Sequence, residues 1–180
     1  MKKNNILCLY FLAIVFSSCY IKGLTNGYKQ LTSEEKRLVH FNTNQSVSKY
    51  SDTIFAYNGL DFRKTLLGEN KTLVYRWSAN CSSKSCIPLT ASQYYCDKNG
   101  YDLVVLLEYF DLKKQRQLGM PLNALIMADF KYYQTNIADK ATNLFIKDLT
   151  STNLKDTSIG YKRFLFFEND KFVKAEENLY

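Results

Sequence analysis

The segment from Lys71 to Pro88, KTLVYRWSANCSSKSCIP, decides which fold the rest of the chain can adopt. It opens with Leu73–Trp77, a run rich in β-branched and aromatic residues that predicts a buried strand. From Ser82 to Lys98 apolar residues recur at helical spacing, and Asn99-Gly100 supplies a helix stop. The sequence therefore predicts a strand followed by a helix, with Cys81 at the junction between them.

Further strand and helix patterns alternate downstream of this segment. Tyr101–Phe110 contains the continuous apolar run LVVLL, which favours a parallel strand covered on both faces. We therefore expect an α/β fold: a central mixed sheet with helices on both faces and a C-terminal β-hairpin. The other strand candidates are Leu122–Met127, Arg163–Phe167 and Lys171–Ala175, and the helix candidates are Lys113–Leu118 and Tyr132–Leu149.

Upstream of this pattern, residues 19–54 are rich in Asn, Thr, Ser and Lys, and we interpret them as a polar tether and N-terminal segment. One short helix is expected there, over Ser33–Val39, opened by Thr32 or Ser33. His40 is the only histidine of the chain, so no His-based catalytic triad is available, and a solvated surface position is expected for it. Residues 55–180 then form one folded domain.

The first nineteen residues have the layout of a secretory signal. Lys2 and Lys3 precede an uncharged run, Ile6–Phe16, that is too short to span a bilayer. Phe16-Ser17-Ser18-Cys19 resembles a relaxed lipobox, in which small residues precede a cysteine that becomes the acylated N-terminus. We expect residues 1–18 to be removed and lipid on Cys19 to anchor a bacterial lipoprotein; an ordinary cleaved signal with an unmodified Cys19 is the alternative.

The charge pattern limits the classes of partner that the chain is expected to bind. Its 24 Lys and Arg exceed its 17 Asp and Glu, but the lysines are scattered among acidic residues instead of forming a basic stripe. Nucleic-acid binding is therefore not supported. Tyr20, Ile21 and Lys22 follow Cys19 without an acidic cluster, which favours a periplasm-facing anchor in the cell envelope.

Three cysteines remain in the expected domain. Cys81 lies where a helix N-terminus favours negative charge, an environment that lowers the pKa of a thiol and makes it reactive. Cys86 follows five residues later, and two residues so spaced in a regular helix are too far apart for a disulfide, so pairing requires an irregular turn. Cys96 is expected on the core face of the same helix as Cys86, away from it.

Residues 71–88 resemble the active-site segment of thioredoxin-like proteins of the membrane-tethered redoxin type. Those proteins have a strand, a tryptophan, three residues and a cysteine, the spacing of Trp77 and Cys81 here, and Pro88 lies within one position of their helix proline. Asp102–Phe110 is similar to their next strand and Phe164–Val173 to their terminal hairpin. The resemblance covers about residues 55–177 and implies a thioredoxin-like domain.

The chain departs from this family pattern at two places. Lys84 stands where the family has its resolving cysteine, three positions after the first, so Cys-x-x-Cys is replaced by Cys81-Ser-Ser-Lys-Ser-Cys86. The family also places a cis-proline before the terminal hairpin, and Ile159–Arg163 contains no proline. These departures put the family's docking feature in doubt and leave two functions open.

The first function is thiol–disulfide exchange with an envelope protein, in which Cys81 attacks, Cys86 resolves and Lys84 stabilises the Cys81 thiolate. The second is a catalytically inactive thioredoxin-like module that binds another envelope protein. Neither function needs a cofactor or a metal. Binding of Cu(I) by the two thiolates is a minor hypothesis, because soft ligands select this ion.

Overall fold

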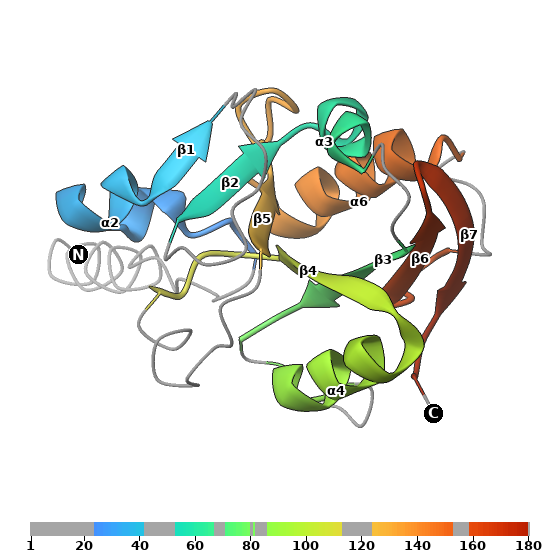
Figure 1. Ribbon diagram of the computed structural model, residues 1–180. Coiled ribbons are helices and arrows are strands. Elements are labelled where there is room, and N and C mark those ends of the chain that lie inside the picture. The colour runs from blue at the N-terminus through green and yellow to red at the C-terminus, as the bar shows by residue number, and fades with distance from the viewer. Residues whose placement is uncertain are drawn as a thin grey trace, which may run out of the picture.

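The computed structural model describes residues 24–41, 53–66, 71–79, 81, 86–112, 124–152 and 159–179 (Figure 1). Several predictions from the sequence lie outside these ranges. They are the signal peptide over residues 1–18, the lipidation site Cys19, the thiolate-stabilising role of Lys84 and the short helix over residues 113–118.

Seven strands of the described part of the chain form one mixed sheet in the order β1-β2-β5-β4-β3-β6-β7. The first five strands of that order run parallel, and β6 and β7 pair antiparallel as the terminal hairpin. The predicted mixed sheet with a C-terminal hairpin is therefore confirmed. The strands are β1 (Val39–Phe41), β2 (Ile54–Tyr57), β3 (Lys71–Trp77), β4 (Tyr101–Leu107), β5 (Ala124–Ala128), β6 (Phe164–Glu168) and β7 (Lys171–Glu176).

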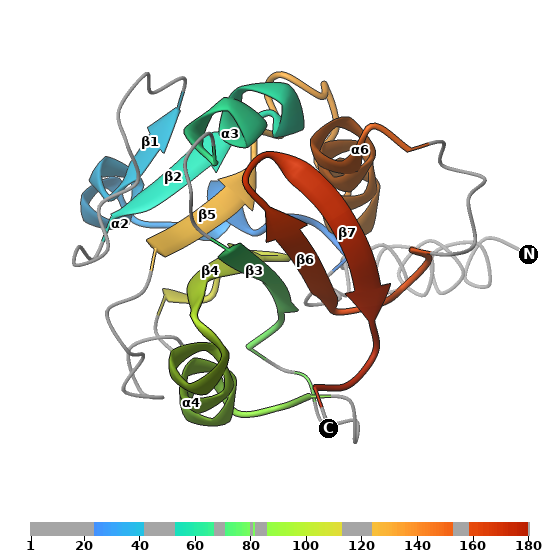
Figure 2. The same cartoon turned by 45° about the vertical axis from the view of Figure 1, so that its right-hand side comes forward.

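Helices cover both faces of the sheet, as predicted, in an arrangement consistent with a thioredoxin-like fold. Helix α4 (Leu89–Asn99) lies on one face, whereas α3 (Gly59–Thr65) and α6 (Ala138–Thr150) lie together on the other (Figures 1 and 2). A short 3-10 helix, η1 (Tyr28–Gln30), and α2 (Ser33–Arg37) lie beside β1. The core is formed where the two helical layers meet the central strands β3, β4 and β5.

Strand β4 shows why a continuous apolar run suits the middle of this sheet. Leu103 to Leu107 are all at most 7% exposed, because α4 covers one face and the α3–α6 layer covers the other. Its neighbours β3 and β5 are parallel to it. Since parallel strands end at the same edge, the loops after β3, β4 and β5 gather at one side of the molecule.

The segment upstream of residue 54 contributes more regular structure than its polar composition indicated. Thr32 caps α2 with a capping box: its hydroxyl accepts from the Glu35 N–H at 3.2 Å, and the Glu35 carboxylate accepts from the Thr32 N–H at 2.9 Å. The chain then enters β1, which pairs with β2 at the edge of the sheet. The predicted helix is confirmed, and neither β1 nor β2 was predicted.

Two helices begin later than their apolar periodicity predicted. Helix α4 begins at Leu89 instead of Ser82, because Pro88 takes the N-cap position with an extended backbone and disfavours helix in the residue before it. Helix α6 begins at Ala138 instead of Tyr132. There the Asp129 carboxylate holds the following residues in turns, and Gln134 has a φ of 50°.

Candidate functional site

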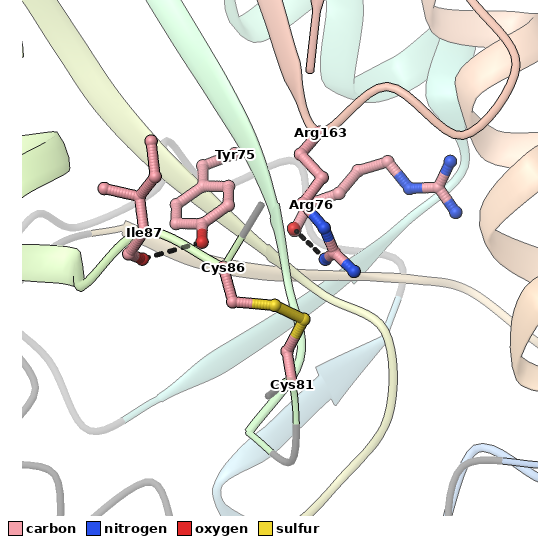
Figure 3. The surroundings of a disulfide bond; sticks show 6 residues. All are labelled: Tyr75, Arg76, Cys81, Cys86, Ile87 and Arg163. Atoms are coloured by element: carbon pink, nitrogen blue, oxygen red, sulfur yellow. Dashed lines mark hydrogen bonds between the residues drawn. A yellow bond between two sulfur atoms is a disulfide. The ribbon is translucent and has the colours of Figure 1, made fainter. Parts of the chain in front are cut away.

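Cys81 and Cys86 are joined by a disulfide in the loop between β3 and α4 (Figure 3). Their Cα atoms lie 5.8 Å apart, within the usual range for a disulfide. Because α4 begins only at Leu89, neither cysteine is in this helix, and the helical spacing that would keep them apart does not apply. Both cysteines are half-buried, so the bridge lies at the molecular surface.

The helix boundary changes the electrostatic setting predicted for Cys81. The sequence placed this residue at the junction of strand and helix, but the chain leaves β3 at Trp77 and reaches α4 only after Cys86 and Pro88. The expected position of Cys81 at the helix N-terminus is therefore wrong. Cys86 is the cysteine closer in sequence to that N-terminus, and other charges must be considered for both.

Tyr75 of β3 is hydrogen-bonded to the end of the disulfide loop that follows Cys86. Its hydroxyl donates a hydrogen bond of 2.8 Å to the carbonyl oxygen of Ile87, the residue after Cys86 (Figure 3). Its ring is 1% exposed and stacks on Phe164 of β6 with centroids 4.5 Å apart. Burial raises the pKa of the Tyr75 hydroxyl, so this group remains a neutral donor across the physiological range.

Arg163 brings a positive charge to the surroundings of the disulfide (Figure 3). Its guanidinium group donates to the carbonyl oxygen of Arg76 at 3.2 Å, and Figure 3 shows it directed toward the disulfide. The backbone of Arg163 is held between two strands: its carbonyl accepts from the Arg76 N–H at 2.8 Å and its N–H donates to the Glu176 carbonyl at 3.1 Å. Arg163 belongs to the proline-free segment Ile159–Arg163.

The side chain of Arg76 points away from the disulfide, into the opposite face of the sheet (Figure 3). It is only 3% exposed and forms an ion pair with Glu108 at 3.2 Å; a second carboxylate, Asp139, lies 3.7 Å away. Its guanidinium also donates to the Gly160 carbonyl at 3.3 Å. These contacts connect the C-terminal ends of β3 and β4 and the start of α6 to the loop before β6.

The remaining candidates lie away from the disulfide. Cys96 is a free thiol that is fully buried on α4, and burial raises its pKa to about 12, which confirms the predicted core role. His40 is exposed on β1, with its ring centroid 6.0 Å from that of Phe55. Among the described residues, no group of three or more His, Cys, Asp or Glu side chains is arranged to hold a metal ion.

The two cysteines were predictable from the sequence, but the residues around them were not predicted. Arg76 carried one usable signal, since an arginine inside a strand expected to be buried requires a charged partner. Tyr75 carried a weaker one, because a buried tyrosine usually finds a hydrogen-bond acceptor. Arg163 carried none, because its proximity to the loop depends on how β6 pairs with β3.

No helix in the part of the chain that the structure describes has the length and apolar character needed to cross a bilayer. Comparison with known proteins gives no match to any family model, any curated protein or any solved structure. The chemistry of the chain therefore has to be inferred from the disulfide loop and its surroundings.

Proposed function

We propose that this protein exchanges disulfides with a partner protein of the cell envelope, with Cys81 as the attacking thiol and Cys86 as the resolving thiol. The observation that carries the proposal is the Cys81–Cys86 bridge itself, which is half-buried at the molecular surface where β3 ends. Buried structural disulfides resist reduction, whereas accessible ones are the labile and catalytic class. The position of the bridge in a loop supports membership of the second class.

The exchange requires only the two thiols and the partner disulfide. The Cys81 thiolate attacks one partner sulfur, a Cys81–partner disulfide forms, and the other partner sulfur leaves as a thiolate and takes up a proton. The Cys86 thiolate then attacks the Cys81 sulfur, the Cys81–Cys86 bond forms, and the second partner thiolate leaves and is protonated. Two electrons and two protons pass from the protein to the partner, and the reverse sequence oxidises a partner dithiol.

Lys84 retains its proposed role as a cation near the Cys81 thiolate, on the strength of its place in the sequence between the two cysteines. No cofactor or metal takes part in the exchange. The half-buried state of both cysteines gives a partner sulfur access to the bridge.

A trapping experiment tests this assignment of roles. The reduced full chain, carrying Cys86→Ser, is mixed with a peptide that contains one disulfide, and the product is analysed by mass spectrometry. We expect the peptide to accumulate on Cys81, because no thiol remains to resolve it, whereas Cys81→Ser gives no trapped product. Cys96→Ala is the matched control and should exchange as the wild type does. Equal exchange by Cys81→Ser and the wild type would contradict the proposal.

An inactive binding module is the second candidate, and one feature of the surface supports it. Tyr161 is 79% exposed on the loop that leads into Arg163, and exposed aromatic side chains are enriched at protein interfaces. In that case the disulfide only stabilises the loop. Replacement of both Cys81 and Cys86 by Ser would then leave partner binding intact, and Tyr161→Ala would weaken it.

We also propose that the chain is exported and held on a membrane by lipid on Cys19, facing the periplasm. The support is the order of Lys2 and Lys3, the apolar run and Ser17-Ser18-Cys19 at the start of the sequence. Metabolic labelling with a fatty acid tests it: the label should be lost in Cys19→Ala and kept in the control Cys8→Ala. Labelling that persists in Cys19→Ala would contradict the anchor.

A further inference from the structure

We infer that Arg163 is a positioning residue for the exchange: its guanidinium group stabilises negative charge on the cysteine sulfur when the Cys81–Cys86 bridge opens. The role of Arg163 in exchange rests on the proposed function, whereas its electrostatic effect on a cysteine thiolate does not. The charge acts on a thiolate of the opened bridge, whatever partner opens it.

The backbone contacts of Arg163 fix the position from which its side chain starts. Residue 163 immediately precedes β6, and its carbonyl and N–H are bonded to Arg76 on one side and to Glu176 on the other, at 2.8 and 3.1 Å. These two bonds hold it between β3 and β7. Its Cα therefore has little freedom to move when the neighbouring disulfide loop changes its redox state.

The guanidinium group is held by a contact that leaves its charge unneutralised. Its side-chain hydrogen bond runs to the carbonyl oxygen of Arg76, at 3.2 Å, and a carbonyl oxygen carries no formal charge. By contrast, the Arg76 guanidinium is paired with the Glu108 carboxylate at 3.2 Å. Within the described ranges, no carboxylate is ion-paired with Arg163.

The positive charge of Arg163 acts on a group close to the cysteines. Burial raises the pKa of the Tyr75 hydroxyl, which bonds to the residue after Cys86. The positive charge of Arg163 opposes this rise, and it acts more strongly there than the charge of Glu108, which adds to the rise. In the view of Figure 3 the Arg163 guanidinium lies on the disulfide side of the Arg76 carbonyl, whereas the Arg76 guanidinium extends away from the disulfide. The direction of the Arg163 side chain and its effect on the pKa of Tyr75 therefore both indicate that its positive charge acts at the disulfide loop.

The charged side chains that the structure describes close to the loop give the sign of the expected effect. Strand β3 contributes neutral Tyr75 and the paired Arg76, the residue after β4 is the paired Glu108, and the loop before β6 contributes Arg163. A positive charge near a thiol favours the thiolate and lowers the pKa of the thiol. Stabilisation of the reduced form also makes the disulfide a stronger oxidant.

The test compares Arg163→Gln, Arg163→Lys and the charge-matched control Lys147→Gln, which removes a cation from the exposed surface of α6. Each full-length variant is chemically reduced, and the alkylation rates of Cys81 and Cys86 by iodoacetamide are followed against pH by mass spectrometry. We expect Arg163→Gln to raise the pH of half-maximal alkylation of at least one of them by about one unit. Arg163→Lys should recover most of that shift, and Lys147→Gln should show none.

Equilibration with glutathione supplies a second readout, which a merely structural role would not move in this direction. Arg163→Gln should make the bridge harder to reduce by about tenfold in the equilibrium constant, or about 30 mV. Unchanged alkylation profiles in a folded Arg163→Gln protein would overturn the inference. Because the profiles are recorded on chemically reduced protein, they report on Arg163 even where the wild-type bridge fails to exchange with any partner, which is the result that would reject the proposed function alone.

Discussion

The hydroxyl group of Tyr75 lies 2.8 Å from the carbonyl oxygen of Ile87, so the centre of the sheet is tied to the residue that follows Cys86. Tyr75→Phe keeps the ring stack on Phe164 but leaves this carbonyl without its donor. We expect the free energy of unfolding to fall by about 1–2 kcal/mol, measured by urea denaturation of the oxidised protein. Tyr94→Phe is the control, because Tyr94 is 64% exposed, and it should change stability by less than about 0.5 kcal/mol.

The two carboxylates near Arg76 should differ in their contribution to stability. Glu108 is 23% exposed and lies 3.2 Å from a guanidinium that is itself 3% exposed, so Glu108→Gln leaves a buried cation without its main partner. We expect a loss of about 2 kcal/mol in chemical denaturation. Asp139 is 57% exposed and 3.7 Å away, and Asp139→Asn should cost less than about 0.5 kcal/mol. Equal costs would show that the pair with Glu108 is not the dominant contact.

The contact between α3 and α6 depends on a glycine. A Cβ atom at Gly59 would meet the Phe145 carbonyl oxygen and lie 2.6 Å from the Leu149 nitrogen, both in the backbone of α6. Gly59→Ala should therefore push the helices apart and reduce the free energy of unfolding by about 3 kcal/mol. Gly100→Ala is the comparison: its Cβ meets nothing within 4 Å, and only its φ of 70° is unfavourable, so about 1 kcal/mol is expected.

The buried thiol on α4 predicts how stability changes at alkaline pH. Burial raises the pKa of Cys96 to about 12, whereas a thiol in the unfolded chain titrates near about 8.5. Above that pH the unfolded state releases a proton that the folded state keeps, so the free energy of unfolding falls by up to about 1.4 kcal/mol per pH unit. The decline is present from about pH 9, before the tyrosines titrate.

Denaturation curves recorded at about pH 7.5, 8.5 and 9.5 measure this slope. Cys96→Ala should be less stable at every pH because it leaves a cavity, but its stability should fall less steeply. The same steepness in Cys96→Ala and the wild type would show that another group causes the loss.

The sequence was sufficient for the class of the fold and for strands β3 to β7, but not for β1 and β2. The run LVVLL in β4 and the pattern of the β6–β7 hairpin are local signals. A strand buried on both faces has a continuous apolar run, and a strand buried on one face has alternating apolar residues, so each can be recognised from its own sequence. Strand β1 escaped prediction because three residues, Val39–Phe41, are too few to show a period. Its stability comes from pairing with β2, which is a tertiary contact.

The site could be predicted only in part. Cys81 and Cys86 were recognisable as a pair, but the late start of α4 at Leu89 was not, because the apolar periodicity includes Ile87, which precedes the N-cap residue Pro88. Arg163 lies far from Cys81 along the chain and reaches the loop through the antiparallel pairing of β6 with β3. A contact of that kind leaves no local pattern in the sequence.

The reduction potential of the Cys81–Cys86 bridge tests the proposed exchange most directly. The full chain is equilibrated with glutathione buffers, alkylated differentially and analysed by mass spectrometry, with Cys96 as an internal reference thiol that stays unpaired. An exchanging bridge should be reduced and reformed with a potential above about −270 mV, in the range of known exchange proteins. A bridge that resists reduction below about −300 mV, or cysteines that never pair, would contradict the exchange function.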